Sequence, residues 1–219
     1  LEFRRVLFRS SSSANATITI TRASTSLAAK NALGTIGQTV NLLSTLTRQP
    51  DKATIEGRTI TFLVNGASVG TAMTDSNGVA TLPYTISEAL GVGSININAS
   101  FAGDTNYRKV NSNTAKLTVN KGKTAVTSAN VTAVRGVDKT LTATLKNATS
   151  GSLLSGKSVT FDITGIGTFT GTTDASGVAS VTINVANTVA TGKYSLTVSF
   201  DGDSLYLSTS KTGYTITVK

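Results

Sequence analysis

The sequence predicts an all-β protein built of two tandem β-sandwiches of about seven strands each. Three observations support this fold class. Threonine, serine, valine, asparagine and glycine are abundant, and these residues favour strands and turns. Short runs of alternating apolar and polar residues recur between turn signals. The whole pattern also repeats along the chain, and such self-similarity indicates tandem structural units.

The internal repeat has a length of 99 residues, and it defines the two predicted domains. Three segments return at this offset: EGRTITF (56–62) as SGKSVTF (155–161), TDSNGVA (74–80) as TDASGVA (173–179), and SFAGDTNY (100–107) as SFDGDSLY (199–206). We expect the register to slip by two residues and to recover in the loop around Arg48–Asp51. The predicted domains are residues 22–120 and 121–219.

The residues before the first domain have a separate interpretation. ATITI at Ala16–Ile20 matches AKLTV at Ala115–Val119, so residues 11–21 are expected to be a tail that ends an upstream repeat. This strand should be disordered or pair with an exposed sheet edge. The chain is accordingly expected to be a fragment truncated at both ends.

The first ten residues, LEFRRVLFRS, resemble a translated sequencing adapter. The codons CTG GAG TTC AGA CGT GTG CTC TTC CGA TCT encode all ten of them. Their apolar run, Val6–Phe8, is shorter than the roughly 7–15 residues of a secretory signal. We therefore interpret residues 1–10 as an artefact. Without its three arginines and one glutamate, the net charge falls from +9 to +7.

The strands of the first domain follow from alternation and from the turn residues between them. Asn65-Gly66 suits a tight hairpin because both residues tolerate positive φ. Asp75–Gly78 forms the next turn, and Pro83 indicates an edge strand or a bulge because proline has no backbone N–H. The predicted strands are Gln38–Leu46, Arg58–Val64, Gly70–Met73, Val79–Ile86, Gly93–Phe101 and Thr114–Asn120.

The same alternation predicts which side chains point inward, because a shift of one residue would turn every side chain to the other face. In the first domain these are Val40, Leu42, Ile60, Phe62, Val64, Leu82, Tyr84, Ile86, Ile95, Ile97, Ala99, Phe101, Leu117 and Val119. In the second they are Leu141, Ala143, Leu145, Val159, Phe161, Ile163, Val181, Ile183, Val185, Tyr194, Leu196, Val198, Phe200, Ile216 and Val218.

Three motifs, present in the same order in both repeats, carry a resemblance to a known family. The patterns G-[RK]-x-[VI]-T-F, T-D-x-x-G-V-A and S-F-x-G-D-x-x-Y resemble the tandem bacterial and archaeal immunoglobulin-like (Ig-like) repeats of large surface proteins and adhesins. The paired cysteines and the core tryptophan of antibody domains are missing, and Phe62 and Phe161 stand at the tryptophan position. The resemblance implies an extracellular or cell-surface protein whose partners include neighbouring repeats.

Composition excludes several classes of chemistry. The sequence contains no cysteine and no histidine, so this chain by itself cannot form a disulfide, a thiolate zinc site or a Ser-His-Asp triad. Nucleic-acid binding is not expected, since the lysines are scattered and few aromatic residues accompany them. No run approaches the roughly 20 apolar residues of a membrane helix, so this segment is expected to make no membrane contact.

The aspartates that follow the sixth strand of each domain are the candidate site residues. Gly103-Asp104 and Gly202-Asp203 precede Tyr107 and Tyr206 by the same spacing. One interpretation is a calcium site, with Asp104, Asp203 and the additional Asp201 as ligands, because calcium prefers carboxylate oxygens. The other, which we favour, is a turn stabilised by the aspartate, with the tyrosine packed over the end of the core. No cofactor is then required.

No residue stands out as catalytic, so an enzyme is not expected. The second domain contains no glutamate, whereas a glycosidase needs two carboxylates across a cleft. The favoured function is a structural repeat of a large prokaryotic surface or secreted protein, acting as a stalk, a spacer or an adhesive array. Two alternatives remain: a module that binds a surface glycan or a host protein, and an accessory domain of a secreted enzyme.

Overall fold

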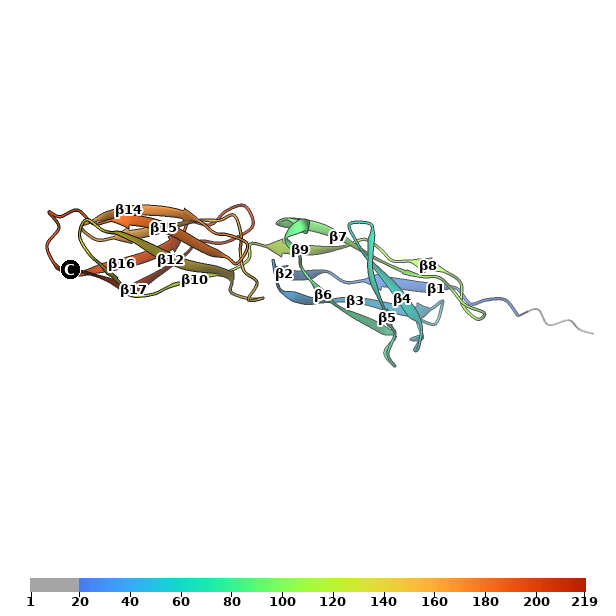
Figure 1. Ribbon diagram of the computed structural model, residues 1–219. Helices are drawn as coiled ribbons and strands as arrows, with labels where there is room; N and C mark the ends of the chain where they lie inside the picture. The colour runs from blue at the N-terminus through green and yellow to red at the C-terminus, as the bar shows by residue number, and fades with distance from the viewer. Residues whose placement is uncertain (1–19) are drawn as a thin grey trace, which may run out of the picture.

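The computed structural model describes residues 20–219, and these form two β-sandwiches that follow one another along the chain (Figure 1). The decamer Leu1–Ser10 and the predicted strand Ala16–Ile20, apart from Ile20 itself, lie outside the described residues. Within the described part, the expected all-β fold of two tandem Ig-like sandwiches is confirmed.

The first sandwich packs a three-stranded sheet, in the order β1-β3-β6, against a larger sheet in the order β2-β9-β7-β4-β5 with β8 beside β7. Its elements are β1 (Thr25–Ala29), β2 (Ala32–Thr35), β3 (Thr39–Arg48), β4 (Thr59–Val64), β5 (Ala67–Met73), β6 (Val79–Thr85), the 3-10 helix η1 (Glu88–Leu90), β7 (Gly93–Phe101), β8 (Val110–Asn111) and β9 (Ala115–Asn120).

The second sandwich repeats this arrangement, with sheets in the orders β10-β12-β15 and β11-β17-β16-β13-β14. Its strands are β10 (Thr124–Ser128), β11 (Val131–Ala133), β12 (Asp138–Asn147), β13 (Ser158–Ile163), β14 (Gly167–Thr172), β15 (Val178–Asn184), β16 (Gly192–Phe200) and β17 (Thr209–Val218).

The first strand of each domain is divided between the two sheets, which the sequence pattern did not predict. β1 pairs antiparallel with β3, and after two residues β2 pairs parallel with β9. Asn31 lies at this crossing, and its side-chain Oδ1 accepts a hydrogen bond from the Lys116 backbone N–H. Asn130 does the same for Thr215 in the second domain. The crossing therefore ties both sheets together at one edge of each sandwich.

The predicted inward side chains form most of the core. Phe62 and Phe161 are fully buried at the position where antibody domains have tryptophan. All other predicted core residues are buried too, except five that are half-buried at the margins: Leu82, Tyr84, Ile95, Val181 and Tyr194. Domains of about 100 residues bury enough apolar surface to fold without disulfides, which agrees with the absence of cysteine.

The turn predictions are confirmed with two corrections. Asn65 and Gly66 have φ values of 50° and 83°, and Pro83 lies on β6 at the edge of its sheet. β5 begins at Ala67 rather than Gly70, because the tight hairpin lets pairing resume at once. The register slip expected near Arg48–Asp51 is wrong. The bridges Thr47–Thr54 and Lys146–Leu153 keep the 99-residue offset across this loop, which differs between the repeats in sequence but not in length.

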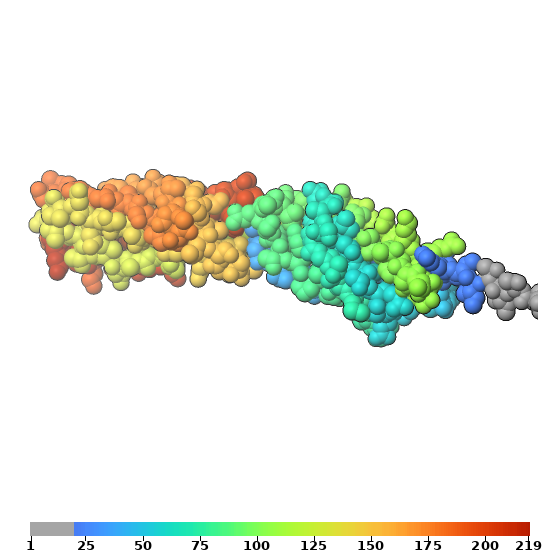
Figure 2. Space-filling view, turned by 45° about the vertical axis from the view of Figure 1, so that its right-hand side comes forward, coloured from blue at the N-terminus to red at the C-terminus, as the bar shows by residue number. Residues whose placement is uncertain are grey.

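The two sandwiches lie end to end and give an elongated molecule (Figure 2). Figure 1 shows the C-terminus at one end of this rod and the start of the described chain at the other. The chain passes between the sandwiches once, from the end of β9 to the start of β10. The loops that surround this passage bring side chains of both domains together.

Candidate functional site at the domain junction

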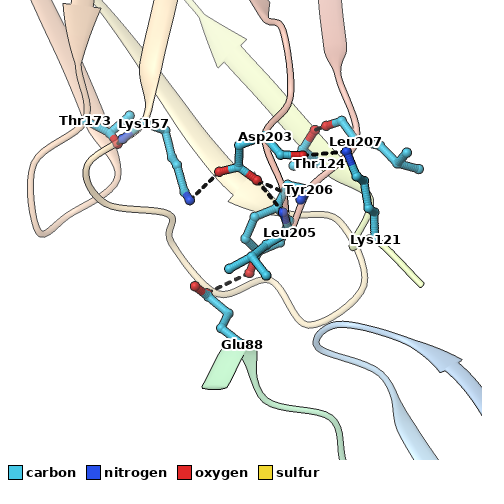
Figure 3. A network of polar contacts seen from close by, with 9 residues as sticks. All are labelled: Glu88, Lys121, Thr124, Lys157, Thr173, Asp203, Leu205, Tyr206 and Leu207. Carbon is cyan, nitrogen blue, oxygen red and sulfur yellow. Dashed lines mark hydrogen bonds and ion pairs between the residues drawn. The ribbon is translucent and has the colours of Figure 1, made fainter. Parts of the chain in front are cut away.

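The link between the domains has almost no free length. Asn120, the last residue of β9, still pairs with Thr35. Two residues later Gly122 already belongs to the second domain: its N–H donates to the Leu205 carbonyl at 2.9 Å, and its carbonyl accepts from the Leu207 N–H at 2.9 Å. Only Lys121 lies between, and its Nζ donates to the Asp203 carbonyl at 2.6 Å (Figure 3). We call residues Asn120–Gly122 the strap.

Two hydrogen bonds cross the junction directly. The Asn147 amide Nδ2 donates to the Ile36 carbonyl at 2.9 Å, and both residues are 1% exposed. The Tyr206 hydroxyl donates to Glu88 Oε1 at 2.6 Å, and Figure 3 shows this side chain directed from the second domain toward the first. Tyr206 is itself only 1% exposed. A buried amide and a bond to a carboxylate are both interactions that penalise separation of the domains.

Close backbone approach on both sides of the junction requires glycine. Gly37 has φ of +85°, and a Cβ placed on it would lie 2.4 Å from Asn147 Nδ2. A Cβ on Gly122 would lie 2.7 Å from the Tyr206 ring and 3.2 Å from the Ile36 carbonyl oxygen. A hollow of about 170 Å³ remains beside these contacts, bounded by residues of both domains. The domains therefore meet here through specific close contacts that a side chain at either glycine would disrupt.

Tyr206 is held in place by a charged pair on its own domain. Lys157 Nζ lies 2.5 Å from Asp203 Oδ2 and 5.2 Å from the centre of the Tyr206 ring. The other carboxylate oxygen, Oδ1, accepts hydrogen bonds of 2.8 Å from the backbone N–H groups of Leu205 and Tyr206. One aspartate thus fixes the loop backbone, positions the lysine and orients the tyrosine (Figure 3).

These contacts change the pKa values of both groups. Burial by itself would raise the pKa of Asp203, but Lys157 and the two backbone N–H donors outweigh burial and hold it below its ordinary value. Burial raises the pKa of the Tyr206 hydroxyl, and the hydrogen bond to Glu88 raises it further. Tyr206 therefore remains a neutral hydrogen-bond donor across the physiological pH range.

The first domain has the same loop 99 residues earlier. Asp104 Oδ1 accepts from the backbone N–H groups of Asn106 and Tyr107 at 2.8 and 2.7 Å. Arg58 takes the place of Lys157: its Nε lies 2.7 Å from Asp104 Oδ2, and its guanidinium carbon lies 5.4 Å from the Tyr107 ring centre. The Arg58 N–H does not point at this oxygen, so the contact is an ion pair without a well-formed hydrogen bond.

The three calcium candidates do not converge in the structure. Asp104 and Asp203 lie in different domains, and each pairs with a basic side chain of its own domain. Asp201 is exposed and makes no side-chain hydrogen bond or ion pair with any residue of the range 20–219. Within that same range, no group of three or more acidic, histidine or cysteine side chains is arranged to hold a metal ion.

Sequence reasoning identified Asp203 and Tyr206 but missed the residues that join the domains. Asn147, Glu88 and Gly37 were not predicted to join the domains, because their partners lie in the other repeat. A signal exists where the repeats differ: Asn147 stands where the first domain has Arg48, and Glu88 where the second has Asn187.

The described helical structure is the three-residue η1, and no described helix is long and apolar enough to span a membrane.

One family model matches the first domain. Residues 25–120 match the family described as "Bacterial Ig-like domain (group 3)". No match was found among curated proteins. Among solved structures, the Yersinia pseudotuberculosis adhesin InvE is 16% identical with a TM-score of 0.40, covering 88% of this chain and 58% of that one. A tetra-tandem repeat from the extending region of a large adhesion protein is 19% identical with a TM-score of 0.45, covering 90% and 49%. This chain thus spans about half the length of these two structures.

The Asp203 contacts predict how the stability of the second domain depends on pH. A carboxyl whose pKa is lowered by folding stabilises the fold above its unfolded pKa, and this stabilisation is lost as pH falls through the folded value. Asp203→Asn should therefore lower the free energy of unfolding by about 1 kcal/mol at pH 7, and this difference should shrink as pH falls below about 4. Denaturant titrations followed by NMR signals of the second domain would measure it.

Asp201→Asn is the matched control, since this neighbouring aspartate is exposed and its side chain makes no hydrogen bond or ion pair with the described residues. Asp201→Asn should leave the free energy of unfolding unchanged at pH 7 and at pH 2. A difference between wild type and Asp203→Asn that stays constant from pH 7 to pH 2 would contradict the role given to the Asp203 charge.

Proposed function

Since residues 25–120 form a bacterial Ig-like domain, we propose that the chain is a non-catalytic, rigid spacer segment of a larger bacterial surface or secreted protein. Its task is to set distance and direction, so that whatever the complete protein presents is projected away from its anchor. The observation that supports this most directly is the strap, in which the chain leaves one domain and joins the next across the single residue Lys121.

The geometry of the junction suits such a mechanical role. A flexible linker would let the domains reorient and would reduce the reach of an array. Here the strap restricts the distance between the domains, while the Asn147 and Tyr206 hydrogen bonds restrict their rotation. Repetition of this geometry along a chain would give a long, directed rod.

The alternative of a glycan- or protein-binding module receives less support from the loops. Exposed aromatic side chains on loops are the usual anchors of a binding surface. Tyr206, one of the two loop tyrosines, is buried at the junction instead. A surface glycan or a host protein would then be bound by another part of the complete protein. If this segment accompanies a catalytic domain, that domain would likewise lie outside it.

We propose further that the two G-D-x-x-Y loops, Gly103–Tyr107 and Gly202–Tyr206, act without calcium. The Lys157 ammonium supplies at Asp203 the positive charge that a calcium ion would supply, and Arg58 does so at Asp104. Excess calcium should therefore leave the unfolding temperature unchanged in wild type and in Asp203→Asn. A ligand present at 100 times its dissociation constant adds about 2.7 kcal/mol of stability. An upward shift abolished by Asp203→Asn would turn the loop into a metal site and overturn this proposal.

Small-angle X-ray scattering of a matched glycine pair tests the rigid junction. Gly37→Ala places a Cβ into Asn147, whereas Gly136→Ala, 99 residues later, meets only the flexible end of Asn187 at 3.2 Å. Both glycines have positive φ, of 85° and 71°, so each variant should cost about 1–2 kcal/mol of domain stability. Wild type and Gly136→Ala should fit one extended conformation, and Gly37→Ala should require an ensemble of bent ones.

The spacer proposal fails if wild type itself requires such an ensemble. It fails equally if Gly37→Ala and Gly136→Ala give the same scattering curve as wild type, because the contacts at Gly37 would then not determine the domain orientation.

A further inference from the structure

The far end of the first domain repeats the surface through which the second domain docks. Ala23 occupies the place of Gly122: its N–H donates to the Asn106 carbonyl at 2.8 Å, and its carbonyl accepts from the Arg108 N–H at 2.9 Å. Thr25 Oγ1 donates to the Arg108 carbonyl at 2.9 Å, as Thr124 does to Leu207 at 2.8 Å. The backbone that receives a strap in the second domain is thus preformed in the first.

The side chains around this backbone form what we call the N-terminal surface, defined as Arg22, Ala23, Arg48, Arg58 and Tyr107. Tyr107 stands where Tyr206 does, but its hydroxyl makes no hydrogen bond to any residue of the range 20–219, whereas Tyr206 donates to Glu88. Arg22, Ala23, Arg48 and Tyr107 line a hollow of about 430 Å³. The Tyr107 hydroxyl stands at the position from which Tyr206 donates, and it lies beside a hollow. It is therefore suited to donate a hydrogen bond to an acceptor on a neighbouring domain.

The charge of the N-terminal surface indicates which acceptor fits. Three arginines face two carboxylates here, since Arg58 pairs with Asp104 and Arg48 pairs with Asp51. Arg22 has no ion pair with the described residues. Arg48 also replaces Asn147, the residue that donates to the Ile36 carbonyl across the existing junction. The surface therefore presents a net positive charge and at least two donors to whatever covers it.

We infer that the N-terminal surface docks a preceding Ig-like repeat that presents a carboxylate at the position of Glu88. We call the positions of Ile36 and Glu88 the C-terminal rim of a repeat. This inference rests on the proposed spacer function and specifies the partner of one surface. The carboxylate would accept from the Tyr107 hydroxyl, and the backbone carbonyl at the position of Ile36 would accept from Arg48. The contact continues, one repeat earlier, an interface that the structure already contains.

The rim of the second domain does not provide this chemistry. Asn187 stands at the position of Glu88, and Arg135 at that of Ile36, where its Nη1 donates to the Asn187 and Val189 carbonyls at 3.3 Å. A positively charged rim would meet a positively charged surface, and like charges at an interface oppose docking. The order of repeats is thus specified by charge, and a second copy of this chain is not the expected occupant.

Tandem duplication of the first domain within the full chain tests the inference. Residues 1–120 followed by 22–219 join Asn120 directly to Arg22, in the register that joins Asn120 to Lys121. The chain has no cysteine, so spin labels can be placed at Leu33 in both copies and at Thr132, the equivalent exposed position of the second domain. Dipolar distance distributions between label pairs then report the new and the native junction separately.

The inference predicts that the distance distribution across the new junction is as narrow as the distribution across the native one. Glu88→Gln in the first copy, or Tyr107→Phe in the second, should reduce the ratio of docked to undocked molecules about 3- to 10-fold, the effect of losing one good hydrogen bond. Ile36→Arg with Glu88→Asn, which imitates the rim of the second domain, should abolish docking. Tyr206→Phe is the control, and it should broaden the native junction alone.

Three results have distinct meanings. The inference is overturned if the distance distribution across the new junction is broad, both with Ala23 in place and with Ala23→Gly, which supplies the glycine found at Gly122. It is also overturned by a narrow new junction that is insensitive to the Glu88 and Tyr107 substitutions, since the short link alone would then account for it. A broad native junction in the same molecules would instead refute the proposed spacer function.

Discussion

The strap is the constraint on which the rest of the structure depends. Asn120 is still paired in the first domain and Gly122 is already paired in the second, so the two domains cannot separate without breaking a sheet or a loop. Two cross-domain hydrogen bonds contribute roughly 1 kcal/mol each and would not hold free domains together. Because the strap makes their contact intramolecular, even these weak interactions compete well with solvent.

The loop beside the strap uses an ion pair to hold the neutral donor Tyr206 in position. Asp203 is ionised because Lys157 and two backbone N–H groups stabilise its charge, and it holds the backbone of Tyr206 in position. The tyrosine can then reach Glu88 from a buried site without becoming charged itself. The first domain repeats the device with arginine in place of lysine, so the motif belongs to the repeat, while its partner depends on the neighbouring domain.

The sequence was sufficient to predict what depends on local periodicity. Strand alternation placed Phe62, Phe161 and most of the core correctly, and the G-D-x-x-Y spacing predicted the aspartate turn. It could not predict the crossing at Asn31, because a strand that changes sheets keeps its alternation. Nor could it predict that Asn147 binds a carbonyl 111 residues away or that Tyr206 binds an acid 118 residues away, since long-range pairs leave no periodic signal.

Residual dipolar couplings of the two-domain chain would test the central claim, a fixed relative orientation of the domains, most directly. If the strap and the junction hydrogen bonds act as described, the backbone couplings of residues 25–120 and 124–218 will fit one alignment tensor with the orientation seen in Figure 1. Two tensors of clearly different magnitude would show that the domains move independently, and would contradict a rigid junction.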